Sequence, residues 1–208
     1  MAELLSFLLL LQNIQGLEEL RFSSVAEQGY DTSCGLSILS DLLTRYWSYP
    51  ITEETLLTEW LSLRQAQTQP ATDNKLHTED IYAISFKDMQ DLLSSHGFVS
   101  KAFRINYTQL VKATSSYAPL ILHFADQEGH FVLCLHVEDD FLVIADPAEG
   151  VYWLSRDDVL LRWQGYALLV QRPGQMKESQ ALRAAVEETL ERRNTLQRLT
   201  QLSLGAYR

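Results

Sequence analysis

Apolar residues in the first half of the chain recur every three or four positions, which is the period of helices that bury one face. One such series contains Ile38, Leu39, Leu42, Leu43, Tyr46 and Trp47. It predicts a helix over residues 36–47. The same spacing predicts helices over 52–63, with Thr52 as N-cap, and over 85–96, capped by Ser85 and ended by Gly97. Residues 64–80 are polar and aperiodic, so we expect a loop there.

The second half of the chain has short apolar runs separated by turn residues, a pattern typical of strands. These runs predict strands at 99–105, 119–124, 130–137, 141–145, 152–154 and 166–171, with a short helix at 107–114. Helices followed by strands predict an α+β fold, with the N-terminal helices packed on one side of a C-terminal antiparallel sheet.

Charge divides the chain near its end. The 17 Lys and Arg residues against 27 Asp and Glu give a net charge of −10, but the segment from Gly174 to the end carries +2 and the preceding residues −12. We therefore predict a boundary at Pro173-Gly174 and three parts: 1–16, 17–172 and 173–208. The apolar run at 4–11 in the first part is consistent with a packed helix, a secretory-signal remnant or an interfacial anchor, and these alternatives stay open.

In the third part, apolar residues that recur with helical spacing between charged ones predict an amphipathic helix over 178–204. Docking on its own domain or self-association is one interpretation. Contact with a membrane or a partner protein is the other.

Composition excludes several classes of function. An acidic surface repels phosphate backbones, so no nucleic acid is expected as a partner. The two cysteines cannot form a disulfide framework. No cofactor is expected and no metal site, because His130, Cys134 and His136 lie on one strand without a compact ligand set.

Cys34 is the candidate nucleophile. It lies at the start of the first long predicted helix, where the helix dipole and free backbone N–H groups favour the thiolate. Gly35 lets another group approach closely. Cys134 lies within an apolar strand, where burial raises a thiol pKa, so we interpret it as structural.

A thiol nucleophile needs a base, and the base needs an orienting group. Of the five histidines, His130 follows Gly129 at the start of a strand, whereas His136 lies about 20 Å further along it. His77 and His96 are expected to be solvated, and His123 to be a satisfied edge or core residue. If the strands at 130–137 and 141–145 pair as a hairpin, Asp146 returns beside His130 and can hold its tautomer. Gln28 can donate to the oxygen of an attacked carbonyl, together with the Cys34 backbone N–H.

These residues lie in motifs that resemble those of the double-glycine (bacteriocin-processing) cysteine peptidases, a papain-like family. The motifs are QGYDTSCG at 28–35, Gly129-His130-Phe131-Val132, Ala145-Asp146-Pro147-Ala148 followed by Gly150, and WQGYALLV at 163–170. The resemblance covers about residues 17–172. It implies a papain-like fold and a catalytic set of Cys34, His130, Asp146 and Gln28.

The resemblance further implies cleavage of a leader or precursor peptide, the expected partner, after a Gly-Gly pair. Ser33 stands where exporter-linked members usually have Asp, and no phosphate-binding loop follows, so the stand-alone bacterial branch is more similar. A periplasmic or membrane-associated location is slightly favoured over the cytoplasm. A non-catalytic adaptor that binds leader peptides, and another acyl-transfer reaction such as deamidation or transpeptidation, remain alternatives.

Overall fold

The computed structural model describes residues 25, 34–67, 84–125, 129–175 and 179–205, and the statements below refer to these residues. The helices are α2 (Cys34–Asp41), its π-helical continuation η1 (Leu42–Tyr46), α3 (Glu53–Gln67), α4 (Phe86–Ser95), α5 (Tyr107–Tyr117), α6 (Arg156–Arg162) and α7 (Ser179–Gly205). The strands are β1 (Val99–Arg104), β2 (Leu120–Phe124), β3 (His130–Val137), β4 (Phe141–Asp146), β5 (Gly150–Ser155) and β6 (Trp163–Gln171).

The strands form one antiparallel sheet in the order β1-β6-β2-β3-β4-β5. Because neighbours run in opposite directions, the ends of β1, β2 and β4 lie at the same edge as the starts of β6, β3 and β5. Phe124 at the end of β2 pairs with both His130 and Trp163, which begin the flanking strands. This edge, called the site edge below, brings together the chain segments that carry the candidate residues.

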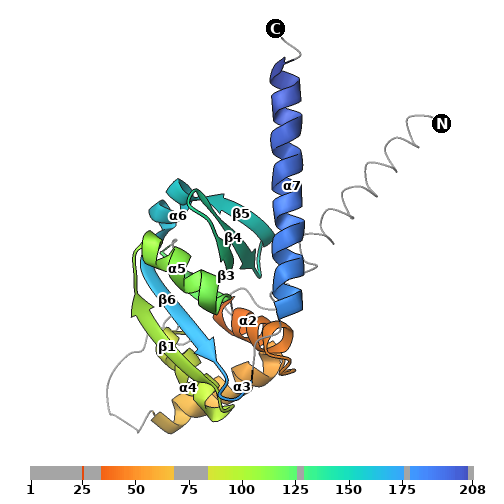
Figure 1. Cartoon of the computed structure of the whole chain (residues 1–208). Coiled ribbons are helices and arrows are strands. Elements are labelled where there is room, and N and C mark those ends of the chain that lie inside the picture. Colours follow the sequence, from red (N-terminus) through yellow and green to blue (C-terminus); the bar gives the residue numbers. More distant parts are fainter. Residues whose placement is uncertain (1–24, 26–33, 68–83, 126–128, 176–178, 206–208) are drawn as a thin grey trace, which may run out of the picture.

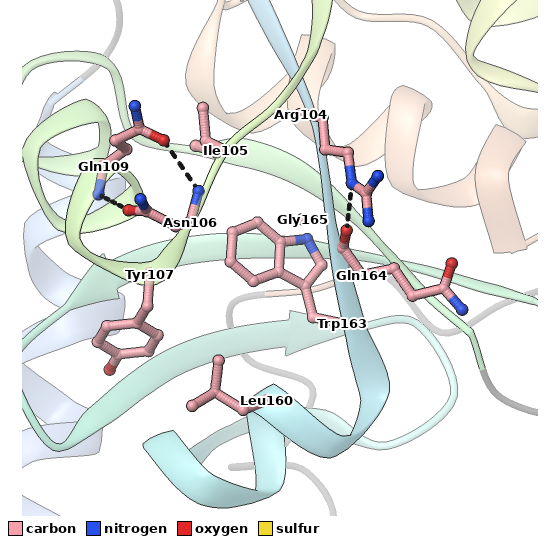
Figure 2. A pocket seen from close by; sticks show the side chains of 9 residues that line it. All are labelled: Arg104, Ile105, Asn106, Tyr107, Gln109, Leu160, Trp163, Gln164 and Gly165. Atoms are coloured by element: carbon pink, nitrogen blue, oxygen red, sulfur yellow. Dashed lines mark hydrogen bonds between the residues drawn. The ribbon is translucent and has the colours of Figure 1, made fainter.

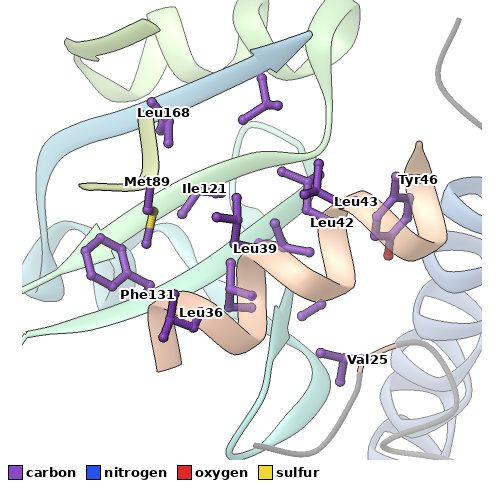
Figure 3. Packing of buried hydrophobic residues seen from close by; sticks show 14 of the residues in the cluster. Val25, Leu36, Leu39, Leu42, Leu43, Tyr46, Met89, Ile121, Phe131 and Leu168 are labelled. Atoms are coloured by element: carbon purple, nitrogen blue, oxygen red, sulfur yellow. The ribbon is translucent and has the colours of Figure 1, made fainter. Parts of the chain in front are cut away.

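Alternate residues of the central strands belong to two separate hydrophobic cores. Ile121 and Leu133 pack with α2, η1 and α4 on one face, as Figure 3 shows for Ile121, Leu36 and Met89. Leu122 and Val132 pack on the other face with α5.

The α+β class, with the N-terminal helices packed on one side of an antiparallel sheet, is confirmed; helix α5, between β1 and β2, covers the other face. Leu110 of α5 is fully buried against the second face of the sheet. All six residues of β4 are buried, and α6 contacts this strand on the same face. A strand covered on both faces has a continuous apolar run instead of alternation, and the run FLVIA in β4 was the signal for this.

Two further boundaries differ from the prediction. Helix α3 continues to Gln67, four residues into the predicted loop, and residues 68–80 of that loop lie outside the described residues. Helix α6 was not predicted, although Ser155 accepts from the Asp158 N–H as its N-cap and two acidic residues occupy its first turn. The predicted cap of α4 is present, because Ser85 and Asp88 form a reciprocal capping box.

Helix α7 packs on the domain only through its first half and projects beyond it (Figure 1). Its first half contacts β5, β3 and η1 and buries Ala185 and Thr189. Arg193 pairs with Asp140 at 3.2 Å and lies over the Phe141 ring. Leu196 and Leu199, further along, are about half exposed. Within the described residues, no helix has the length and apolar character needed to cross a membrane.

Candidate active site

Cys34 is the first residue of α2 and is partly exposed. The first N–H groups of a helix have no partner within it, and they form the positive end of its dipole. The thiol therefore lies in an environment that stabilises a negative charge on sulfur.

Gly35 explains how α2 approaches the sheet so closely. A Cβ atom at this position would lie 2.3 Å from Ile84 Cγ2, 2.7 Å from Met89 Cε and 3.1 Å from Phe131 Cδ2. Phe131 follows His130 in β3. The absence of a side chain at Gly35 thus seats the helix that carries Cys34 against the strand that carries His130.

His130 and Asp146 meet at the site edge. His130 Nε2 lies 2.9 Å from Asp146 Oδ2, and the two side chains are 20% and 1% exposed. Cys34 is the other neighbour of His130, because the hydrogen bond and charge of its side chain contribute to raising the His130 pKa. The structure therefore brings the three predicted side chains together from α2, β3 and β4.

Asp146 is held as an anion by several donors. Its Oδ1 accepts from the backbone N–H groups of Ala148 and Glu149 at 2.8 and 3.3 Å. Its Oδ2 accepts from His130 and from the Tyr152 hydroxyl, at 3.2 Å. Burial raises the pKa of this carboxyl, but the hydrogen bond and charge of His130 and the backbone donors outweigh it, so the pKa is lowered.

His130 is held as a cation by its neighbours. Burial lowers its pKa, but the hydrogen bonds and charges of Asp146 and Cys34 outweigh burial and raise the pKa to about 10. An imidazolium between a carboxylate and a thiol is the arrangement that favours a reactive thiolate.

The second cysteine lies elsewhere. Cys134 is fully buried on the α5 face of the sheet, and burial raises its thiol pKa to about 12. This confirms its interpretation as an inert core residue. His136 is beyond it on β3 and lies 3.4 Å from Glu138, away from the His130–Asp146 pair.

The other histidines have structural surroundings. His123 packs on Phe131 and Phe86, as expected for a satisfied residue. The expectation for His96 is wrong, because its side chain is only 14% exposed and hydrogen-bonds to Glu59 at 2.7 Å and to Tyr49 at 3.0 Å. Sequence spacing could not show that α3 passes beside the end of α4. Gln28 and His77 lie outside the described residues.

Sequence reasoning missed two residues near the pair. Tyr152 on β5 donates to Asp146, and the charge and hydrogen bond of Arg162 at the end of α6 lower the Tyr152 pKa. The Asp146↔Gly150 pairing of β4 and β5 places Tyr152 on the same side as Asp146. Because side chains alternate along a strand, a strand that begins at Gly150 opposite Asp146 would have indicated Tyr152 as a neighbour of Asp146.

A separate open pocket of about 470 Å³ lies further along the site edge, between β1, α5, α6 and β6 (Figure 2). Its wall includes Ile105, Leu160 and Trp163, and Arg104 Nε donates to the Gln164 carbonyl at its rim, 3.1 Å away. None of Cys34, His130 and Asp146 lines it.

The fold is that of papain-like cysteine peptidases. The peptidase domain of ComA from Streptococcus, a bi-functional ABC transporter, superposes with a TM-score of 0.56 over 71% of this chain and 97% of that domain, at 15% identity.

The sequence comparisons define the family. Residues 72–175 match the peptidase C39 family. Two relatives are described as functional amyloid proteases, FapD: that of Pseudomonas fluorescens is 27% identical over 82% of this chain and 70% of the relative. That of Pseudomonas aeruginosa is 24% identical over 91% of this chain and 78% of the relative. The chain belongs to the peptidase C39 family and is a cysteine peptidase.

Proposed function

We propose that this cysteine peptidase hydrolyses peptide bonds of a leader or precursor peptide with Cys34 as nucleophile, His130 as base and acid, and Asp146 as the orienting group. The observation that carries the proposal is the position of His130 at the site edge: its Nε2 lies 2.9 Å from Asp146 Oδ2, and the charges of Asp146 and Cys34 both raise its pKa. Because Nε2 faces Asp146, Nδ1 is the ring nitrogen available to the thiol. This tautomer control is the role of the third member of a catalytic triad.

The chemistry follows in two steps. His130 holds the proton of the thiol as an imidazolium, the Cys34 thiolate attacks the peptide carbonyl, and the imidazolium then gives its proton to the leaving amine. Water, deprotonated by His130, hydrolyses the resulting thioester and restores the thiol. The Cys34 backbone N–H, together with the Gln28 amide, would stabilise the oxyanion of each tetrahedral intermediate.

Cleavage after a Gly-Gly pair is the narrower part of the proposal. It is supported by the sequence motifs shared with double-glycine peptidases, and the membership of the C39 family is consistent with it. The description of the two relatives supports a protein of a functional amyloid system as a substrate class. Mass spectrometry of a Gly-Gly peptide and of an Ala-Ala control, incubated with the enzyme, separates hydrolysis from acyl transfer, because only hydrolysis adds one water across the cut bond.

The test of the catalytic set needs no substrate. The alkylation rate of Cys34 is followed from about pH 4 to pH 9 in a Cys134→Ser background, with and without His130→Ala. An ordinary thiol titrates near pH 8.5, whereas an ion-paired one stays reactive well below pH 7. We expect low-pH reactivity that His130→Ala removes. A rate that rises only near pH 8.5 and is the same with and without His130→Ala would contradict the proposal and favour a peptide-binding adaptor.

A further inference from the structure

The hydrogen bonds at Asp146 continue beyond the three candidate catalytic residues. The Tyr152 hydroxyl donates to Asp146 Oδ2, the same oxygen that His130 Nε2 contacts. The charge and hydrogen bond of Arg162 in turn act on the Tyr152 phenol and lower its pKa against the effect of burial. The series Arg162, Tyr152, Asp146, His130 and Cys34 therefore links α6, β5, β4, β3 and α2.

The direction of these hydrogen bonds is fixed by chemistry. A guanidinium has only donors, so Arg162 must donate to the phenol oxygen. A phenol has a single proton, and the only acceptor then left for it among these groups is the Asp146 carboxylate. Burial and the charges of Asp146 and Glu149 raise the pKa of Tyr152, so the phenol keeps this proton throughout the working range.

Both residues are held by other contacts. The Arg162 guanidinium lies 4.7 Å from the centre of the Phe124 ring, and the Arg162 carbonyl accepts from the Ala125 N–H at 2.7 Å. Phe124 pairs with His130 across β2 and β3. Tyr152 pairs with Ile144 across β4 and β5, and its ring packs against the α5-side core. The Arg162–Tyr152 end of the series is therefore anchored in the sheet.

We propose that Tyr152 and Arg162 are positioning residues of the active site: Arg162 directs the Tyr152 proton onto Asp146 Oδ2, and Tyr152 thereby holds that oxygen in line with His130. Neither residue touches the thiol or is required to touch substrate. The inference rests on the proposed function, since it assigns a role through Asp146.

The test compares the pH dependence of Cys34 alkylation in three variants, all in the Cys134→Ser background. Tyr152→Phe removes a donor that stabilises the Asp146 carboxylate, so the Asp146 pKa rises and His130 loses its anionic partner at a higher pH. The acid limb is the part of the pH profile in which the alkylation rate falls as the pH is lowered. We expect its midpoint to move upward by about one pH unit in Tyr152→Phe. We also expect kcat on a peptide substrate to fall about tenfold with KM unchanged, which is the effect of one hydrogen bond to a charged group. Arg162→Gln should move the limb in the same direction by less, and Arg162→Lys should restore it.

Tyr107→Phe is the matched control. Tyr107 is a tyrosine of the same core and is buried, but its hydroxyl donates to the Glu138 carbonyl at 2.8 Å, near the opposite end of β3. It should lower the urea midpoint of unfolding and leave the acid limb in place. If Tyr152→Phe and Tyr107→Phe give the same acid limb as the parent, the positioning role is overturned.

Two safeguards keep the outcomes separate. If Tyr152→Phe does not fold, Arg162→Gln decides, because it leaves the phenol in the core, and an unmoved acid limb then overturns the inference. If the parent itself lacks His130-dependent reactivity at low pH, the proposed function fails first and this inference fails with it.

Discussion

Gly35 of α2 lies against Phe131 of β3 so closely that a Cβ atom would stand 3.1 Å from the Phe131 ring. Each residue is the direct neighbour of a candidate catalytic residue, Cys34 in one case and His130 in the other. Packing at this one contact therefore sets the separation of thiol and imidazole.

Gly35→Ala should damage both folding and chemistry. The new methyl group must displace Ile84 and Met89, which are themselves buried, and overpacking of this kind costs about 1–3 kcal/mol. We expect a lower urea midpoint and a loss of Cys34 reactivity at pH 6. Adding Ile84→Ala, which removes the Cγ2 atom that the new methyl group would meet, should recover part of the reactivity. A Gly35→Ala variant with parent stability and reactivity would show that the contact does not set the geometry.

Asp146→Asn should reduce turnover while leaving substrate binding almost intact. The amide keeps the shape but removes the charge that holds His130 as an imidazolium, and the loss of an equivalent charge in a triad costs several powers of ten. We expect kcat to fall by about 10²-fold or more with KM little changed. Asp140→Asn, at the exposed partner of Arg193, is the control and should behave as the parent. Equal activity of both variants would exclude Asp146 from the mechanism.

The pH dependence of stability should carry a signature of His130. The pKa of this residue is about 10 in the folded chain and 6.5 for an ordinary histidine. The folded protein therefore holds a proton that the unfolded chain has lost between these values. Its contribution is complete below about pH 6.5 and is lost as the pH rises toward about 10.

Urea midpoints at pH 6, 8 and 10 measure this contribution. The difference between the parent and His130→Gln should shrink across that range. Groups away from the site titrate equally in both proteins and cancel, whereas Asp146 and Cys34 interact with His130, so the difference measures the contribution of His130 together with these two partners. A constant difference from pH 6 to pH 10 would mean that the imidazolium pair with Asp146 does not form.

The two halves of α7 should differ in their effect on stability. A chain that ends at Asn194 keeps the buried contacts of Ala185 and Thr189. Its free energy of unfolding in urea should therefore match that of the full chain within about 0.5 kcal/mol. A chain that ends at Gly174 loses those contacts together with the packing of Val186 and Leu190, and should lose about 3 kcal/mol or more.

Sedimentation of the same proteins tests the surface that the second half exposes. A shift to a smaller species in the chain that ends at Asn194 would assign self-association to this half. Unchanged sedimentation and unchanged partition onto anionic vesicles would remove both self-association and membrane contact as its role. Pull-down with a candidate partner then remains the discriminating measurement.

Local patterns were sufficient to predict most elements and the meeting of His130 with Asp146. His130 begins β3 and Asp146 ends β4, and a short turn joins the other ends of these two strands. The proximity of the two residues therefore depends only on the pairing of one hairpin. The surroundings of His96 depend instead on how α3 packs beside α4, which no local pattern reports. The roles of Tyr152 and Arg162 were missed for a related reason: they act across strand neighbours and through an unpredicted helix.

The division of β3 between two cores has a consequence for how this hairpin can vary. His130 and Phe131 face different sides of the sheet, so a single inserted or deleted residue near the start of β3 would exchange the imidazole for a phenyl ring in front of Asp146. Changes in length are tolerated only where they leave that parity intact. The turn at Glu138–Asp140, at the other end of the hairpin, is the place where residues can be inserted or deleted while His130 stays opposite Asp146.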